Sequence, residues 1–563
     1  MNAVTAAPRS AELLEQLSAR MSTLLQERGA LSSVQMEYAR QKQRVEAKPL
    51  WHVLIDNGLA RERDVCEALA ALLGCDFVRT EQIGPPDAAV LALFSQDMCM
   101  AAQFLPLRRE GPGLVLLLGD TWPADVAQLV LRRCGLRCRF VVGEFSRVRA
   151  LIRDCFVFAQ HPVAHLVDQE IRQLALDQEG TRSPATFLDH LLHLAVQERA
   201  TDIHVVPGPA SAHVLFRVDG VLHPAYALPT GLMRMVSYVK LLAEMDISEK
   251  RRPQDGSFRA RIADVPYSIR LSTIVTDLGE RLVMRLLPES HDLKGLVELG
   301  FYEEDAQRIG AAMQAPSGLV VITGPTGSGK SSTLHAGLRM QRLIERNVLT
   351  VEDPIEYRVP VAGQTEVNRK AGYDFHVALR HFLRHDPDVM LVGEMRDAET
   401  VAAALDAATT GHLVLSTLHV TTAIGVLSRL NLLGARPQVL AENLLMVVNQ
   451  RLVRRNCPAC SVPLPFTAHQ SEWLGLPHGS AGMHGPGCPL CRGTGFFGRV
   501  PVYEMLTVSQ PLADLIATDA PRSALRAAAQ AGGFQTIDTS AKRRIAEGVT
   551  TCEEVERAMG IGP

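Results

Sequence analysis

The sequence predicts a multidomain α/β protein, in which a core built around a phosphate-binding loop follows two smaller α+β domains. At 563 residues the chain is too long for one hydrophobic core, so roughly three to five domains are expected. From about residue 319, apolar strand-like segments alternate with helical segments, which is typical of a parallel sheet. A glycine-rich loop joins the first of these strands to a helix.

The composition is that of an ordinary globular protein, with 47% hydrophobic and 21% charged residues. The 58 basic and 61 acidic residues give a net charge of -3, without the basic surplus expected of a nucleic-acid-binding protein. Residues 1–20 show no basic start followed by an apolar run, so no secretory signal is expected. Since no apolar run is long enough to span a bilayer, we expect a cytoplasmic protein that reaches membranes through partners.

The N-terminal third is expected to contain a helical arm and a small domain. In residues 1–47, apolar positions such as Leu13, Leu14, Leu17, Met21 and Leu24 recur at helical spacing. This arm could dock a partner or pack on its own domain. Residues 48–160 alternate helical segments (61–73) with short strands (114–118 and 139–142), which predicts a small α+β domain.

Three further segments complete the predicted organisation. Residues 161–184, which end in Thr-Arg-Ser-Pro, are expected to be a linker. Residues 185–295 combine a helix (187–199) with strands (213–218 and 283–287) in a second α+β domain. Residues 296–563 hold the α/β core, with strands 319–323, 348–351 and 389–392, an insert at about 455–495 and Ala-rich terminal helices.

Residues 324–331, Gly-Pro-Thr-Gly-Ser-Gly-Lys-Ser, match the Walker A pattern of a P-loop. The glycines let successive backbone N–H groups face the β- and γ-phosphates, and the following helix adds its positive N-terminal end. Lys330 would neutralise phosphate charge and the Ser331 hydroxyl would bind Mg²⁺. The predicted ATP-binding residues are Gly324, Pro325, Thr326, Gly327, Ser328, Gly329, Lys330, Ser331 and Ser332.

Glu394 follows the apolar strand 389–392, shortly after His-Asp-Pro-Asp at residues 385–388. An acid at the end of a buried strand beside a P-loop can organise Mg²⁺ and the attacking water, so we predict that Glu394 is catalytic. The alternative is a solvent-facing carboxylate at a strand end.

Eleven cysteines without an export signal indicate a reducing compartment. Cys457 and Cys460 form one Cys-x-x-Cys pair, and Cys488 and Cys491 form a second pair 27 residues later. Four soft thiolates suit tetrahedral Zn²⁺, with a redox dithiol as the alternative. The remaining cysteines are expected mostly in hydrophobic cores: Cys66, Cys75, Cys99, Cys134, Cys138, Cys155 and Cys552.

Taken in order, these motifs resemble the secretion ATPase superfamily that includes GspE, PilB and the retraction motor PilT, over about residues 185–560. Residues 351–356 (Val-Glu-Asp-Pro-Ile-Glu) resemble its Asp box, 392–397 its Walker B segment and 411–419 its His box. The resemblance implies a RecA-like core. The catalytic residues that it implies are Glu352, Asp353, Glu356, Glu394 and His419.

One segment departs from that family. After the His box the family usually continues with Thr-Asn-Asp-Ala, whereas this chain has Val420-Thr421-Thr422-Ala423. The absence of the Asn-Asp pair puts a sensing role of this segment in doubt.

Residues 201–204 (Thr-Asp-Ile-His), 216–220 and 251–256 resemble the domain that precedes the core in this family. Its arginines close over the nucleotide, which implies that Arg270 and Arg285 are arginine fingers. Strand alternation puts Arg270 on a polar face, whereas Arg285 lies in an apolar run and is expected to be desolvated. The resemblance also assigns charge around the nucleotide or subunit interface to Arg380, Arg384 and Arg396; surface ion pairs are the alternative for every arginine.

Residues 48–59 resemble the start of the N-terminal domain of GspE/PilB-like motors. Some of these domains bind cyclic di-GMP through a segment that begins Arg-Leu-Gly and later includes Gln. Here the segment begins Lys48-Pro49-Leu50 and the Gln is missing, so docking on a membrane-anchored partner is expected instead.

The resemblance implies a homohexameric ring that uses ATP, Mg²⁺ and Zn²⁺ and acts on an inner-membrane platform protein to build a pilus or pseudopilus. Type II secretion and type IV pilus assembly both remain open, and the tetracysteine insert is typical of assembly motors rather than retraction motors. The alternatives are a nucleic-acid translocase of the RecA-like class, a pilus retraction motor and a docking protein that does not hydrolyse ATP.

Overall fold

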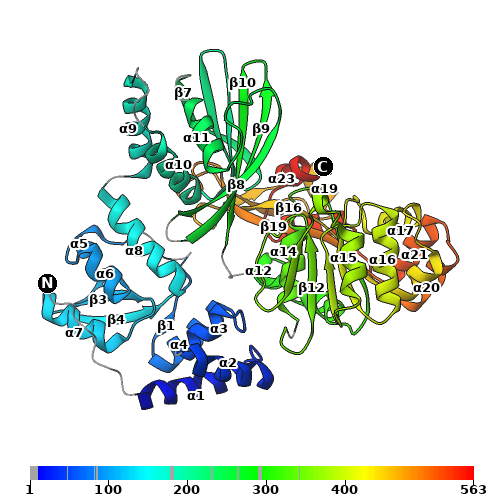
Figure 1. Cartoon of the computed structure of the whole chain (residues 1–563), viewed down its shortest axis with the longest axis horizontal. Coiled ribbons are helices and arrows are strands. Elements are labelled where there is room, and N and C mark those ends of the chain that lie inside the picture. The colour runs from blue at the N-terminus through cyan, green and yellow to red at the C-terminus, as the bar shows by residue number, and fades with distance from the viewer. Residues whose placement is uncertain are drawn as a thin grey trace. The chain divides into compact units, whose positions relative to one another are not determined.

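The computed structural model describes residues 11–46, 48–80, 83, 86–160, 162–177, 183–229, 233–262, 265–289, 294–341 and 343–563 (Figure 1). The chain divides into two compact units, Met1–Asp292 and Leu293–Pro563. Each unit is described by itself. Within the described residues, no helix is both long enough and apolar enough to cross a membrane.

The first unit begins with a helical layer followed by a four-stranded sheet of order β1-β4-β3-β2, in which β3 and β4 are parallel and β2 and β3 antiparallel. Its elements are α1 (Ala11–Glu27), α2 (Ser33–Glu46), α3 (Leu50–Asp56), α4 (Glu62–Leu73), β1 (Asp76–Phe77), α5 (Ala88–Leu91), α6 (Gln96–Ala102), β2 (Phe104–Glu110), β3 (Gly113–Leu118), α7 (Pro123–Cys134), β4 (Arg137–Val142) and α8 (Phe145–Gln160).

The N-terminal helices pack on their own domain. Helix α1 lies against α4 and α2 against α3, and the side chains of Met21 and Leu25 are fully buried. Burial of apolar side chains from one helical stripe explains this packing. Of the two predicted arrangements for residues 1–47, the described part shows packing on the chain's own domain, and partner docking by this segment remains a prediction; residues 1–10 and the side chains of Leu13 and Leu14 lie outside the described residues.

The second part of the first unit is a six-stranded antiparallel sheet of order β7-β6-β5-β10-β9-β8 with helices on one face. Its elements are α9 (Val163–Leu176), α10 (Ala185–Gln197), β5 (Ala200–Val206), β6 (Ser211–Val218), β7 (Val221–Pro229), α11 (Arg234–Leu242), β8 (Gln254–Ile262), β9 (Val265–Thr276) and β10 (Gly279–Pro288).

The predicted linker 161–184 is wrong for most of its length. Helix α9 occupies Val163–Leu176 and packs against α10, and the side chains of Val163, Val167 and Leu174 are buried in one core with Phe187. These three apolar residues lie on one stripe of the helix. Because polar residues separate them along the chain, the sequence suggested a linker instead of a packed helix.

The second unit is built on a seven-stranded sheet of order β13-β12-β14-β15-β11-β16-β19, in which only β19 is antiparallel to its neighbour. Its main elements are α12 (Leu296–Leu299), α13 (Glu303–Met313), β11 (Gly318–Thr323), α14 (Lys330–Arg339), β12 (Val348–Glu352), β13 (Gly363–Glu366), α15 (Phe375–Phe382), β14 (Val389–Val392), α16 (Ala398–Thr409), β15 (Leu413–Leu418), α17 (Ala423–Leu432), α18 (Pro437–Asn443), β16 (Leu444–Asn456) and β19 (Phe496–Thr507).

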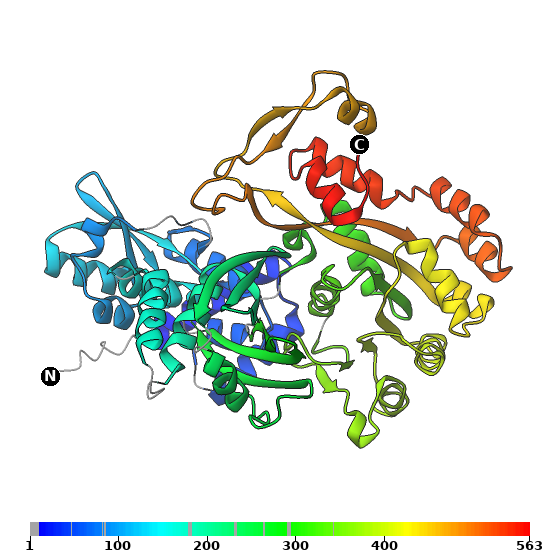
Figure 2. The same ribbon diagram turned by 90° about the horizontal axis from the view of Figure 1, so that it is seen from above.

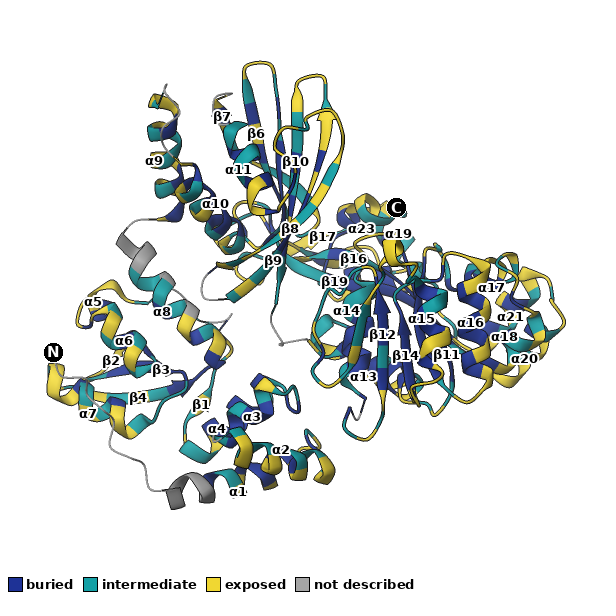
Figure 3. Ribbon diagram, viewed as in Figure 1, coloured by how far each residue is buried: buried dark blue, intermediate teal, exposed yellow. Residues whose placement is uncertain are grey.

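Helices cover both faces of this sheet. One core joins α12, α13 and α14 to the sheet, and the other joins α15–α18 with α20 (Gln510–Ala517) and α21 (Arg522–Ala531). Figure 3 shows the buried strands between helices whose outer faces are exposed. The carboxyl ends of the parallel strands meet at one edge, which is where open α/β sheets bind ligands.

The insert lies between the long antiparallel strands β16 and β19. It consists of the hairpin β17 (Val462–Pro465) and β18 (Ala481–His484) with α19 (Ala468–Leu474) between them, and Figure 2 shows it projecting from the main sheet. The chain ends with α22 (Ile537–Ala546) and α23 (Cys552–Met559), as the Ala-rich pattern predicted.

The cysteines outside the insert differ in burial. Cys66, Cys99 and Cys552 are buried, as expected, whereas Cys75, Cys134, Cys138 and Cys155 are only half-buried. Since only three of these seven cysteines are buried, the prediction that most of them belong to hydrophobic cores is wrong.

Asp120, which follows β3, connects the sheet of the N-terminal domain to its helical layer. Its carboxylate accepts a hydrogen bond from Trp51 Nε1 (3.1 Å) and lies 2.8 Å from His52 Nε2, both on α3. The hydrogen bond to Asp120 raises the pKa of His52 above 6.5, although burial opposes the shift. A raised pKa means that the pair stabilises the fold at low pH and loses this effect as pH rises through the folded-state pKa.

We therefore expect His52→Asn to destabilise the protein at pH 6 and to have a smaller effect at pH 8.5. Thermal unfolding of both proteins across this range measures the difference. His478→Asn, at an exposed histidine, is the matched control and should show no such trend. A wild-type advantage that grows with pH would contradict the assigned pair.

Candidate nucleotide site and metal centre

The P-loop connects the buried strand β11 to helix α14 at the carboxyl edge of the sheet. Gly324, Gly327 and Gly329 have φ values of 144°, 78° and 87°, where residues with a Cβ are strained. A Cβ at Gly324 would lie 2.3 Å from the carbonyl oxygen of Gln450, so this position also needs glycine for space. The buried Ser328 hydroxyl has no hydrogen-bond partner among the described residues, which suits a phosphate oxygen as its partner.

Lys330 is the first residue of α14, and its Nζ donates to the carbonyl oxygens of Gly324 (2.9 Å) and Pro325 (3.0 Å). Burial lowers the pKa of Lys330, and the negative charges of Glu394 and Glu356 oppose this shift. The lysine therefore lies within electrostatic reach of two carboxylates that the sequence assigned to the site. A half-buried ammonium at a helix N-terminus favours a polyanion such as triphosphate.

Glu394 and His419 come together because β14 and β15 are adjacent parallel strands. Glu394 follows β14 and pairs with Arg396, and its Oε2 lies 3.4 Å from Nε2 of His419, which follows β15. The Thr417 hydroxyl donates to the carbonyl oxygen of Gly393 (2.6 Å), which fixes the two strand ends to each other. An acid, a histidine and an arginine thus meet at one strand edge.

In the Asp box, Glu352 lies at the end of β12 and is only 5% exposed. It lies 3.2 Å from His335 Nε2 and accepts hydrogen bonds from Thr350 Oγ1 (2.8 Å) and Gln364 Nε2 (3.0 Å). Burial works against both charges, yet the hydrogen bond and mutual attraction raise the pKa of His335 and lower the pKa of Glu352. His335 also donates from Nδ1 to the Ser331 carbonyl oxygen (2.8 Å), so Glu352 is attached to the P-loop helix.

The other two carboxylates of the Asp box have different surroundings. Asp353 is paired with Arg369 (2.6 Å), and Glu356 contributes to the field at Lys330. The catalytic roles of Glu352, Asp353 and Glu356 remain predictions.

The segment that departs from the family sequence is held by hydrogen bonds. Thr323 Oγ1, at the end of β11, donates to the carbonyl oxygens of Leu418 and Val420 (both 2.9 Å), and Val420 N lies 3.0 Å from the same hydroxyl. The Thr422 hydroxyl accepts from Gly425 N and caps α17. Threonine therefore supplies the N-cap of this helix, so the cap does not need an Asp.

Arg270 and Arg285 are directly opposite each other on β9 and β10, and Asp202 on β5 is opposite Arg285. Arg285 Nε donates to Asp202 Oδ1 (2.9 Å), and its side chain is 54% exposed. The predicted desolvation of Arg285 is therefore wrong: strand alternation buries Met284 and Leu286 and turns Arg285 to the outer face. Both arginines lie in the first unit, whereas the P-loop lies in the second.

The three remaining predicted arginines are exposed and belong to the second unit. Arg384 Nη2 lies 3.1 Å from His381 Nδ1, and Arg396 pairs with Glu394. Their predicted place around the nucleotide or at a subunit interface remains a prediction for Arg380, Arg384 and Arg396.

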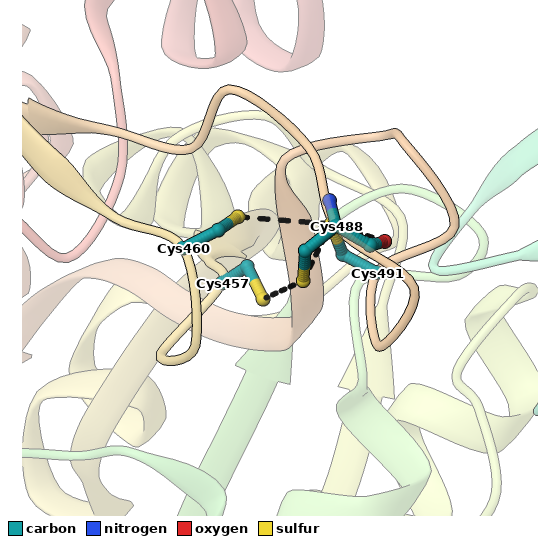
Figure 4. Close-up of side chains that lie close together, drawn as sticks. All are labelled: Cys457, Cys460, Cys488 and Cys491. Carbon is teal, nitrogen blue, oxygen red and sulfur yellow. Dashed lines mark hydrogen bonds between the residues drawn. The ribbon is translucent and has the colours of Figure 1, made fainter.

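The four cysteines of the insert converge from two loops (Figure 4). All four Sγ atoms lie within 4.8 Å of one another, with Sγ···Sγ distances of 3.7 Å (Cys457–Cys488), 3.8 Å (Cys460–Cys491) and 3.7 Å (Cys488–Cys491). Tetrahedral zinc with bonds of about 2.3 Å separates its sulfur ligands by about 3.8 Å. The donor set therefore fits Zn²⁺.

Backbone N–H groups stabilise the thiolate form of Cys491, which is the form that binds metal. Burial opposes its ionisation, but the backbone N–H groups of Cys488 and Gly495 point at its Sγ (3.1 and 3.3 Å) and hold the pKa of Cys491 at about 6. Burial raises the pKa of Cys460 to about 12. A bound cation would compensate the charge of the thiolates together.

Comparison with known proteins identifies the family of this chain. Residues 177–557 match the family described as "Type II/IV secretion system protein", and residues 73–161 match the MshEN domain. This chain belongs to the type II/IV secretion system protein family. It is of the GspE/PilB type, as its motifs predicted.

Relatives in this family align over much of the chain. It is 35% identical to the type IV pilus assembly ATPase PilB of Thermus thermophilus over 91% of this chain and 59% of that protein's length. It is 31% identical to PilB of Myxococcus xanthus (96% and 98%) and 41% identical to the type II secretion system protein E of Pectobacterium carotovorum (68% and 77%). The Legionella pneumophila ATPase DotB, at 23% identity and a TM-score of 0.51 over 68% of this chain and 97% of that chain, shares the fold.

Sequence reasoning missed three buried residues near the site: His335 and Gln450, which bond to P-loop carbonyl groups, and Asn449, which bonds to the segment after His419. His335 lies one helical turn after Ser331, so helix periodicity could have found it. Asn449 and Gln450 carry no local signal, since their partners are distant in sequence.

For the metal centre we expect about one zinc per chain in purified protein, and Cys460→Ser should lower this content and destabilise the insert. Metal analysis and thermal unfolding measure both effects. Cys134→Ser, a half-buried cysteine outside the cluster, is the control and should retain zinc. A fully folded wild-type protein without metal would contradict the zinc centre.

Proposed function

We propose that this chain hydrolyses ATP to ADP and phosphate, and that hydrolysis powers assembly of a pilus or pseudopilus in a type IV pilus or type II secretion system. The observation that carries the proposal is the position of Glu394, beside His419 and Arg396 and within electrostatic reach of Lys330. A phosphate-binding loop alone would support only nucleotide binding; a strand-end carboxylate beside it supports hydrolysis. The named relatives are assembly and secretion proteins, which favours assembly over retraction.

In the proposed reaction, different residues bind the phosphates, hold Mg²⁺ and orient the attacking water. The side chain of Lys330 and the backbone N–H groups of residues 324–331, except Pro325, would bind the β- and γ-phosphates, and the Ser331 hydroxyl would hold Mg²⁺. Mg²⁺ bound there would neutralise charge on the phosphate oxygens. Glu394 orients a water for attack on the γ-phosphorus; as the new P–O bond forms, the bond to the β–γ bridging oxygen breaks and ADP leaves.

Arg270 and Arg285 are proposed to approach the phosphates as arginine fingers, from the same chain or a neighbouring subunit. Their direct opposition on β9 and β10 places two guanidinium groups on one outer face, where they can bind oxygen atoms of one triphosphate. We also propose that the chain forms a homohexameric ring, in which a neighbouring subunit can supply these arginines.

The proposed partners are an inner-membrane platform protein and a membrane-anchored protein that docks on residues 48–160. Through these partners the cytoplasmic motor would lie at the inner membrane. We propose that the N-terminal domain serves docking rather than cyclic di-GMP binding, since Lys48-Pro49-Leu50 lacks the Arg-Leu-Gly start.

We expect Lys330→Ala and Glu394→Gln each to lower ATP turnover at least about a hundredfold, with different effects on binding. Lys330→Ala removes a phosphate contact and should weaken nucleotide affinity, whereas Glu394→Gln keeps the shape of the site and should retain it. Phosphate release and titration with a fluorescent ATP analogue measure the two. Glu399→Gln, an exposed carboxylate on α16, is the control. Near wild-type turnover by Glu394→Gln would remove the catalytic assignment.

For the arginine fingers we expect Arg270→Ala and Arg285→Ala to reduce turnover by about 10³-fold or more while the protein stays folded. Because Arg285 is also paired with the buried Asp202, Asp202→Asn provides the control: it breaks the ion pair but keeps the guanidinium. ATPase rates and circular dichroism distinguish the roles. Equal loss in Asp202→Asn and Arg285→Ala would make Arg285 a structural residue.

A further inference from the structure

Two consecutive residues of β16, Asn449 and Gln450, lie beside the end of the P-loop strand. In the parallel pairing of β11 with β16, Asn449 is the partner of Thr323, the last residue of β11. Since successive side chains of a strand point to opposite faces, the two amides reach different loops. Both are almost completely buried, and neither belongs to a motif that the sequence identified.

Gln450 attaches the P-loop to β16. Its Nε2 donates to the carbonyl oxygen of Ser328 (2.8 Å), and its Oε1 accepts from the hydroxyl of Thr333 in the first turns of α14 (3.0 Å). A Cβ at Gly329 would lie 3.2 Å from the Gln450 amide nitrogen, so glycine there makes room for this contact. A loop with three glycines at positive φ has much conformational freedom, and an external hydrogen bond restricts it.

Asn449 attaches the segment that follows His419. Its Nδ2 donates to the carbonyl oxygen of Thr421 (2.9 Å) and to Oε1 of the buried Glu504 (3.1 Å). Glu504 also accepts from the backbone N–H of Ala423, the first residue of α17, and of Ile537, the first residue of α22 (3.1 Å). Strand β16 therefore holds both the segment after the His box, through Asn449, and the P-loop, through Gln450.

We propose that Asn449 and Gln450 are positioning residues for ATP turnover. Gln450 keeps the P-loop in its phosphate-binding conformation, and Asn449 keeps the segment after His419 in place so that His419 stays beside Glu394. This inference rests on the proposed ATPase function. It predicts separable effects, because the P-loop binds the ground state whereas the residues around Glu394 act in the chemical step.

The test uses the full chain and two amide-to-apolar variants of similar size. Gln450→Met should weaken affinity for a fluorescent ATP analogue about tenfold or more, because the Ser328 carbonyl loses its buried donor. Asn449→Leu should retain that affinity and lower kcat about tenfold or more. Gln438→Met and Asn431→Leu, whose amides bond to Ala517 and Asp519 away from the P-loop, are matched controls and should keep wild-type values.

Several outcomes separate this inference from the function on which it rests. Wild-type protein that does not hydrolyse ATP would overturn the proposed function, whereas active wild-type protein with folded Gln450→Met and Asn449→Leu variants at control values would overturn the inference. If Gln450→Met fails to fold, Gln450→Glu replaces it, because Glu keeps the acceptor for Thr333 but loses the donor to Ser328. If Asn449→Leu fails to fold, Asn449→Ala replaces it. Unchanged affinity in Gln450→Glu and unchanged kcat in Asn449→Ala would then overturn it.

Discussion

The parallel pairing of β11 with β15 on one side and β16 on the other is the constraint on which the nucleotide site depends. Together with the pairing of β14 and β15, it brings three loops and two strand side chains to one sheet edge: the P-loop after β11, the loop with Glu394 after β14, the loop with His419 after β15, and the amides of Asn449 and Gln450 in β16. Parallel strands with helices on both faces are buried, so these ends are held rigidly while the loops beyond them carry the chemistry. A shift of β16 by one residue would exchange the faces reached by Asn449 and Gln450.

Charge balance follows from that arrangement. Lys330, Arg396 and Arg451 bring positive charge to the strand edge, and Glu394 and Glu356 bring negative charge. Burial lowers the pKa of both Lys330 and Arg451, which makes an anionic ligand a favourable partner for the group. The buried pair of His335 and Glu352 connects α14 to β12, and His335 also donates to the carbonyl oxygen of Ser331.

The four-cysteine cluster concerns the stability of the insert rather than the nucleotide site. Strand β17 is exposed along its whole length, so the hairpin has little core of its own. Cross-linking both ends of the insert through four thiolates would supply the stability that burial does not. The insert is anchored to the main sheet through Phe466, Trp473 and Leu474, which pack against the core that β16, β19, α22 and α23 share. Helix α23 is attached to β16 by the buried carboxylate of Glu554, which binds Arg454 (2.7 Å).

Features whose chemistry lies in contiguous residues could be predicted from the sequence alone. These are the P-loop, the strand-end carboxylate Glu394 and the paired cysteines, since each is recognised from the spacing of a few neighbouring residues. Three other features are visible only in the folded chain: α9 belongs to a core, Arg285 is paired with Asp202, and Gln450 bonds to Ser328. The last two partners are 83 and 122 residues away along the chain, and no local pattern encodes a contact that depends on strand pairing across such a distance.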